Sequence, residues 1–114
     1  MQSMIQKGII NSQELQNALA QRDAGEQAFV LVDVREEGEY NMSHIKGVDM
    51  LKPLSTMAEW VEPLIEETKD KIVIFTCHTG ARSGDIQDVF KKNGHMQTLN
   101  HIGGIMSYRG EVVR

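Results

Sequence analysis

A lone cysteine follows an apolar run and stands on a short loop of polar and flexible residues, just before a helical pattern. Cys77 comes directly after residues 72–76, which are apolar or β-branched, and Arg82 stands within the loop. Backbone amides at the start of a helix and a neighbouring guanidinium both favour a thiolate, which is the nucleophilic form of cysteine. The alternative is a buried cysteine that only fills space. The polar neighbours of Cys77 favour the nucleophile.

The spacing from Cys77 to Arg82 is C-x4-R. A loop of this length can curl until its amides point at the sulfur, which makes a nest for a small anion. Gly80 provides a position where a positive φ costs little. The residues alone leave several chemistries of an activated thiolate open.

The composition indicates one ordinary globular domain over residues 1–114. Hydrophobic residues make up 40% of the chain and charged residues 25%, as in soluble proteins. Twelve basic residues against 16 acidic ones give a net charge of −4, so a nucleic-acid partner is not expected. The N-terminal residues lack the apolar run of a signal peptide, and no stretch is long enough to span a membrane. A cytoplasmic location is therefore expected, or a periplasmic one for a trimmed chain.

The single cysteine also limits redox and metal chemistry. It cannot form an internal disulfide, and there is no second cysteine for a dithiol relay or a thiolate metal site. His95 and His101 show no metal-ligand spacing with each other or with Cys77. We therefore expect neither a metal nor a cofactor.

Hydrophobic periodicity predicts helices that alternate with strands. Asn11 followed by Glu14 has the pattern of a capping box, and so has Thr56 followed by Glu59. Pro63 should kink or split the second of these helices. The expected helices cover residues 12–22, one or two turns of 36–41, 56–65 and 83–93, the expected strands cover residues 28–32, 50–51, 72–76 and 96–100, and residues 43–47 and 103–104 are expected to form a loop and a flexible turn.

This alternation indicates an α/β domain with a mainly parallel central sheet. Ligands of such sheets bind outside the carboxyl ends of the strands. Asp33 and Cys77 both stand at such ends, so they could share one crevice. A structural ion pair or a bracing hydrogen bond is expected for Asp33 and Arg35, and Asp33 has the better claim to a site role.

Residues 77–83, Cys-His-Thr-Gly-Ala-Arg-Ser, resemble the active-site loop of single-domain rhodanese-like sulfurtransferases. Further segments resemble the same family in the same order, so the resemblance covers about residues 10–110. The ordered set is more specific than any one motif. These segments are Leu31-Val-Asp-Val-Arg-Glu36, Glu39-Tyr40, His44-Ile45 with Gly47, and Gly103-Gly104-Ile105.

The resemblance implies a rhodanese-like fold, with helices on both faces of the sheet, and a sulfurtransferase of the thiosulfate type. Cys77 would take the outer sulfur of a donor such as thiosulfate, and cyanide or a thiol would remove it from the resulting Cys77 persulfide. A protein could also serve as donor or acceptor. The implied substrate-binding residues are His78, Thr79, Gly80, Ala81, Arg82 and Ser83, with Asp33 and Arg35 in support.

Two features keep alternatives open. In the family that this sequence resembles, many members that use thiosulfate carry arginine at the position of His78. A mostly neutral histidine weakens the case for thiosulfate as the donor. His78 could tune the pH dependence or simply face solvent.

The related cell-cycle phosphatases use a cysteine loop one residue longer, since phosphate needs a wider cradle. The C-x4-R spacing therefore favours sulfur over phosphate. The other alternative is a non-catalytic rhodanese module that binds a protein partner or senses oxidants through Cys77.

Overall fold

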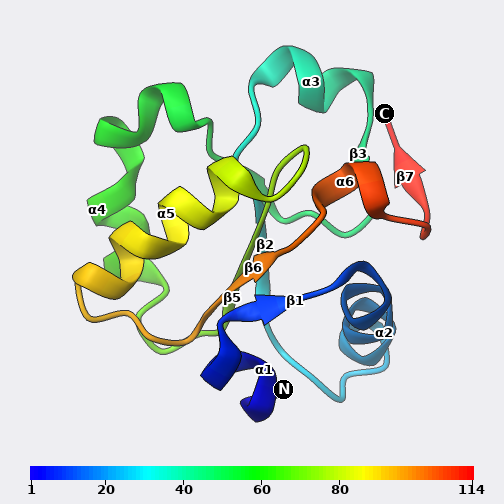
Figure 1. Ribbon diagram of the computed structural model, residues 1–114, viewed down its shortest axis with the longest axis horizontal. Helices are drawn as coiled ribbons and strands as arrows, with labels where there is room; N and C mark the ends of the chain where they lie inside the picture. The colour runs from blue at the N-terminus through cyan, green and yellow to red at the C-terminus, as the bar shows by residue number, and fades with distance from the viewer.

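A five-stranded parallel sheet forms the centre of the computed structural model, which describes residues 1–114 (Figure 1). Its strands lie in the order β1-β6-β5-β2-β4, and each neighbouring pair runs parallel. β3 and β7 form a separate antiparallel ribbon. The predicted α/β architecture with a mainly parallel sheet is thus confirmed. The strands are β1 Ile9–Ile10, β2 Val30–Asp33, β3 His44–Ile45, β4 Met50–Leu51, β5 Val73–Thr76, β6 Thr98–His101 and β7 Val112–Val113.

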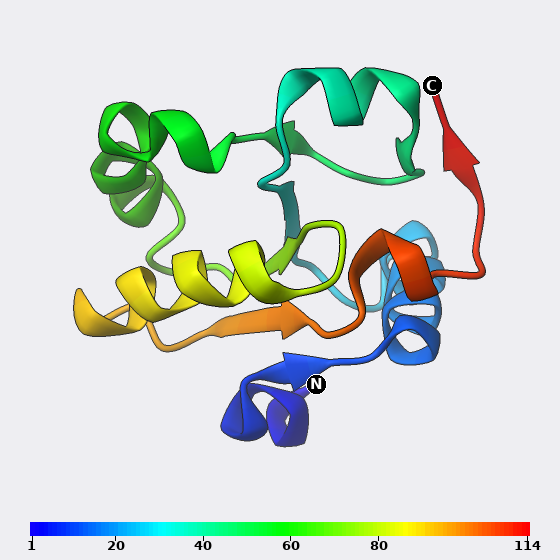
Figure 2. The ribbon, with the colours of Figure 1, turned by 45° about the horizontal axis from the view of Figure 1, so that its top comes forward.

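Helices cover both faces of this sheet, as Figure 2 shows. On one face α4 and α5 enclose a core that contains Val32 and Phe75, and on the other face α2 packs on Leu31 and Ile74. Successive strand residues therefore point to opposite faces and are buried on both, as the continuous apolar runs predict. None of the helices has the length and apolar composition needed to cross a bilayer. The helices are α1 Gln2–Lys7, α2 Ser12–Asp23, α3 Glu37–Met42, α4 Met57–Glu67, α5 Ala81–Lys92 and α6 Gly104–Ser107, with the 3₁₀ helix η1 Leu54–Thr56.

The start of α2 confirms the first predicted capping box. The Asn11 side chain accepts a hydrogen bond from the amide of Glu14 at 2.8 Å, and the Glu14 carboxylate accepts one from the amide of Asn11 at 2.9 Å. Two amides that lack partners within the helix are satisfied in this way. The local sequence is therefore sufficient to place this helix end.

The start of α4 differs from its prediction. Thr56 makes no capping bond, because η1 precedes the helix and the Thr56 hydroxyl donates to the carbonyl of Pro53 at 3.3 Å. Pro63 does not split α4, which is one continuous helix. Pro63 and Glu59 both lie on the exposed face, so the carbonyl of Glu59, which loses its helical donor, is open to water.

Three short strands and two short α-helices, α1 and α6, were not predicted. β1, β3 and β7 have two residues each, and β3 lies in the segment expected to be a loop. Strands of this length carry no readable alternation and exist because a partner strand lies beside them. α1, at the N-terminus, was also missed, and it buries no residue fully.

The register of the central strands determines which residues meet. β2 and β5 pair with Asp33 opposite Thr76, and β5 and β6 pair with Phe75 opposite Asn100. The carboxyl ends of the three strands therefore lie at one edge of the sheet. Cys77, directly after β5, stands between the ends of its two neighbours.

Candidate active site

Cys77 lies on a tight loop between β5 and α5. Gly80 caps the helix with a φ of 104°, and a Cβ there would come within 3.2 Å of the His101 carbonyl. Only glycine adopts this conformation without strain. Cys77 itself is 1% exposed, so a donor has to enter the cradle formed by the loop in order to reach the sulfur.

Three hydrogen-bond donors point at the Cys77 sulfur. The amide of Gly80 lies 3.1 Å from Sγ, the amide of Ser83 lies 3.4 Å away and the Ser83 hydroxyl 3.3 Å away. Burial by itself would raise the pKa of the Cys77 thiol. The hydrogen bonds from the Ser83 hydroxyl and from the amides of Ser83, Gly80 and Thr79 outweigh burial, so the pKa lies below its ordinary value.

Asn100, which sequence reasoning missed, holds this loop at two points. Its Nδ2 donates to the Gly80 carbonyl at 3.0 Å, and its Oδ1 lies 2.6 Å from the Ser83 hydroxyl oxygen, so Oδ1 and the Cys77 sulfur share the single proton of that hydroxyl. The available signal was a polar residue near the end of a predicted strand. This polar residue can be linked to Cys77 only when β6 is known to lie beside β5. The order of the elements along the chain does not show that these two strands are neighbours.

Replacing Ser83 by alanine is expected to raise the pKa of Cys77, because the hydroxyl donor is lost while the backbone amide stays. At pH values below the pKa of Cys77, where the thiolate fraction limits the rate, alkylation by iodoacetamide should become several-fold slower. The rate measured as a function of pH tests this. Ser55→Ala is the matched control, since the Ser55 hydroxyl bonds to Glu36 and not to the sulfur. Superimposable profiles for Ser83→Ala and the unaltered protein would contradict the assignment.

The Arg82 side chain reaches toward α3 and makes no hydrogen bond to the sulfur. Its guanidinium donates to both carboxylate oxygens of Glu39, at 2.7 and 3.0 Å. The hydrogen bond from Arg82 lowers the pKa of Glu39 to about 2. Glu39 is therefore part of the surroundings of the cradle, although the sequence showed it only as part of a family-like Glu-Tyr pair.

Asp33 and Arg35 form a buried ion pair at the end of β2. The Arg35 Nε and Nη2 groups donate to the Asp33 carboxylate at 2.9 to 3.1 Å, and the two residues are 1% and 4% exposed. Nη2 also donates to the carbonyl of Ser43 at 2.7 Å. Neither side chain hydrogen-bonds to Cys77. Asp33 and Arg35 instead hold the segment around α3 in place, and Glu39 reaches Arg82 from this helix.

The remaining loop residues form the rim of the cradle. His78, Thr79 and Ala81 are exposed, so these three predicted binding residues face solvent.

His101 is buried, and burial lowers its pKa to about 4. It lies between the hydroxyls of Thr76 and Ser12, each 2.8 Å from a ring nitrogen, and braces the end of β6.

Gly103 and Gly104 form the start of a short helix, where a flexible turn was predicted. α6 begins at Gly104 and lies against the cysteine loop, with the amides of Ile105 and Met106 donating to the carbonyls of Cys77 and His78 at 2.9 and 3.1 Å. A Cβ on Gly104 would overlap both carbonyl groups. Glycine is required here because two backbones touch.

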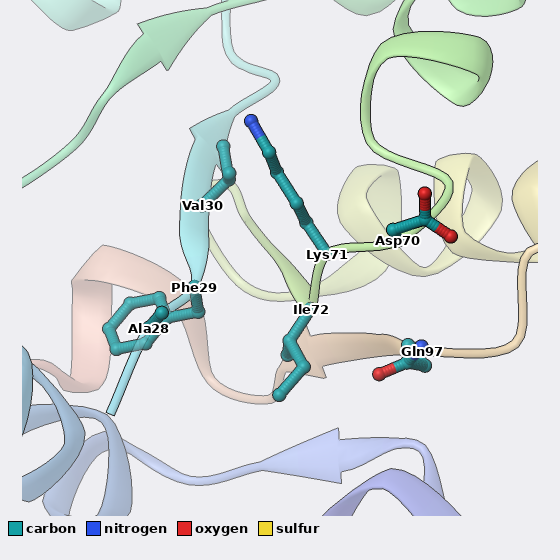
Figure 3. Close-up of a pocket in the computed structure, with 7 residues that line it drawn as sticks. All are labelled: Ala28, Phe29, Val30, Asp70, Lys71, Ile72 and Gln97. Atoms are coloured by element: carbon teal, nitrogen blue, oxygen red, sulfur yellow. The ribbon is translucent and has the colours of Figure 1, made fainter. Parts of the chain in front are cut away.

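A pocket of about 400 Å³ lies at the opposite edge of the sheet (Figure 3). It opens at the start of β2 and β5, whereas Cys77 follows the end of β5. Cys77 and its loop do not line it, so the chemistry of the cysteine is not located there. Its lining residues are Ala28, Phe29, Val30, Asp70, Lys71, Ile72 and Gln97.

Comparison with known proteins agrees with the geometry. A family described as "Rhodanese-like domain" matches residues 12–111. YqhL of Bacillus subtilis is 33% identical over 78% of this chain and 68% of its own length. YrkF of the same bacterium, which bears the name of a sulfur carrier protein, is 32% identical over 82% of this chain, and the match covers about half of YrkF, 49%.

A solved structure shows the same fold. The crystal structure of a rhodanese-like domain protein from Staphylococcus aureus matches 90% of this chain and 91% of its own with a TM-score of 0.73 at 27% identity. The fold and the family match both span nearly the whole chain, which therefore belongs to the rhodanese-like domain family.

Proposed function

We propose that this domain transfers a sulfane sulfur through a persulfide on Cys77. The observation that carries the proposal is the cradle, in which Gly80 and Ser83 direct three donors at the sulfur and the pKa of the thiol is lowered. Such a cradle holds a thiolate ready to attack and then stabilises the charge of the persulfide, as preorganised donors do in an oxyanion hole. The name of YrkF agrees with this class of chemistry.

The transfer has two balanced half-reactions. In the first, the Cys77 thiolate attacks the outer sulfur of a donor such as thiosulfate, a bond from Sγ to that sulfur forms, and the electron pair of the donor S–S bond leaves with sulfite. In the second, cyanide or a thiolate attacks the outer sulfur, and the electron pair of the Sγ–S bond returns to Cys77. No external oxidant is needed. Small anions and thiols are thus the proposed partners, and proteins that carry a persulfide or a thiol are further ones.

The first turn of α5 offers the outer sulfur a place. The amides of Ala81 and Arg82 have no hydrogen-bond partner in the chain, as expected for the first amides of a helix. They adjoin the amides that already point at Sγ. In an anionic persulfide the outer sulfur, one atom beyond Sγ, carries negative charge. The amides of Ala81 and Arg82 are the donors available to that outer sulfur.

Intact-protein mass after incubation with thiosulfate tests the proposal. We expect the protein to gain the mass of one sulfur atom and to lose it when cyanide is added. Protein alkylated beforehand serves as the control, because Cys77 is the only cysteine. No adduct with thiosulfate, a thiosulfonate or a thiol persulfide would rule out sulfur transfer. Peroxide-dependent gain of oxygen without any gain of sulfur would favour an oxidant-sensing module.

A further inference from the structure

The cation at the mouth of the cradle is already paired with an anion. Arg82 and Glu39 form a bidentate pair, with Nη1 to Oε1 at 2.7 Å and Nη2 to Oε2 at 3.0 Å. Their side chains are 31% and 36% exposed, so the pair stands at the surface where a donor would enter. Arg82 therefore presents little net positive charge to an incoming donor.

A second contact positions Glu39 independently of Arg82. Its Oε1 accepts the amide of Glu36 at 3.0 Å, which completes a capping box at the start of α3. The carboxylate is ionised over the neutral range, because the hydrogen bond from Arg82 lowers its pKa to about 2. Glu39 is thus a charged group held in place by its own helix.

No other permanent cation lies on the loop. The residues between Cys77 and Arg82 are His-Thr-Gly-Ala, and the chain as a whole carries a net charge of −4. Glu39 therefore cancels the charge of the one fixed cation on the cysteine loop, while Arg35, at the end of β2, is already paired with Asp33. A doubly charged anion gains little electrostatic attraction from such a surface.

We propose that Glu39 determines which sulfur donors the domain accepts, by neutralising Arg82 and so favouring donors with at most one negative charge, such as thiol persulfides, over the dianion thiosulfate. This inference rests on the proposed sulfur transfer. With a persulfide R–S–SH, the Cys77 thiolate attacks the outer sulfur, the new Sγ–S bond forms, and the electron pair of the donor S–S bond leaves with the thiolate R–S⁻. The proton of the outer sulfur stays on the transferred atom and is then released to solvent.

Glu39→Gln tests the inference, since the amide oxygen of glutamine still accepts the Glu36 amide but carries no charge. The donors are thiosulfate, with two negative charges, and methanethiosulfonate, with one. We expect kcat/KM for thiosulfate to rise about tenfold and that for methanethiosulfonate about threefold, because the attraction of the freed Arg82 scales with donor charge. Glu37→Gln is the matched control, because it removes the same charge from the same helix without touching Arg82.

The salt dependence of kcat/KM gives a second readout. In the unaltered protein, kcat/KM for thiosulfate should stay flat or rise as salt is added, whereas in Glu39→Gln it should fall. Equal changes for both donors, a loss for thiosulfate in Glu39→Gln, or a steep fall with salt in the unaltered protein would overturn the role of Glu39. If no donor places sulfur on Cys77 at all, the proposed function fails instead, so the two failures are distinguishable.

Discussion

Replacing Cys77 by serine is expected to abolish sulfur transfer, with a loss of turnover of roughly a thousandfold or more and no sulfur adduct in the intact mass. The serine hydroxyl stays protonated at neutral pH, and the cradle lowers the pKa of a thiol by hydrogen bonding without any base to remove a hydroxyl proton. Turnover of thiosulfate and cyanide to thiocyanate, followed together with the protein mass, measures the effect.

The fold should tolerate this change. Serine is close to cysteine in shape, and its oxygen can still accept the amide of Gly80 that now points at Sγ. Circular dichroism and thermal unfolding should therefore resemble those of the unaltered protein, which separates loss of the nucleophile from loss of the structure. A sulfur adduct on Cys77→Ser would mean that sulfur is bound elsewhere and would refute the assignment of Cys77.

Gly104→Ala is expected to displace the cysteine loop. The new Cβ would overlap the carbonyls of Cys77 and His78, and the residue has a φ of 58° that alanine adopts at a cost. Together these effects should lower the free energy of unfolding by about 2–4 kcal/mol and move the loop away from its donors. Urea denaturation measures the stability, and the rate of alkylation of Cys77 at neutral pH should fall as its pKa rises.

Gly25→Ala separates the two causes. Gly25 also has a positive φ, 76°, but an added Cβ would meet nothing within 4 Å. This variant should lose only about 1 kcal/mol of stability and should keep the reactivity of the thiol. If Gly104→Ala behaved like Gly25→Ala in both measurements, the close approach of α6 to the loop would have no functional importance.

The parts of the fold that could be predicted have local causes. The capping box of α2, the buried strands β2 and β5 and the strand-loop-helix unit around Cys77 all follow from residues next to one another in the sequence. The second capping box failed because a 3₁₀ turn before α4 offered Thr56 another acceptor. The capping pattern shows which hydrogen bond Thr56 is able to make. The neighbouring turn determined which hydrogen bond it does make.

The parts of the site that could not be predicted depend on strand order and helix placement. Asn100 reaches the loop only because β6 pairs with β5, and Glu39 reaches Arg82 from 43 residues away along the chain. The sequence places Arg82 on the cysteine loop, but its partner Glu39 could not be read from the sequence. The direction in which a charged side chain points depends on where α3 packs, which no local pattern encodes.

The contacts between Gly104, Asn100 and the cysteine loop also have a consequence for folding. The donors to the sulfur are held by the last central strand and by the helix that follows it, so they cannot be in place until the C-terminal part of the chain has docked. An unfinished chain carries a thiol of ordinary pKa and low reactivity. Because the folded pKa of Cys77 is the lower one, the thiolate adds to stability as pH rises above that value, and the increment is complete above the unfolded pKa. The reactivity of this one thiol thus reports how much of a refolding sample has reached the finished domain.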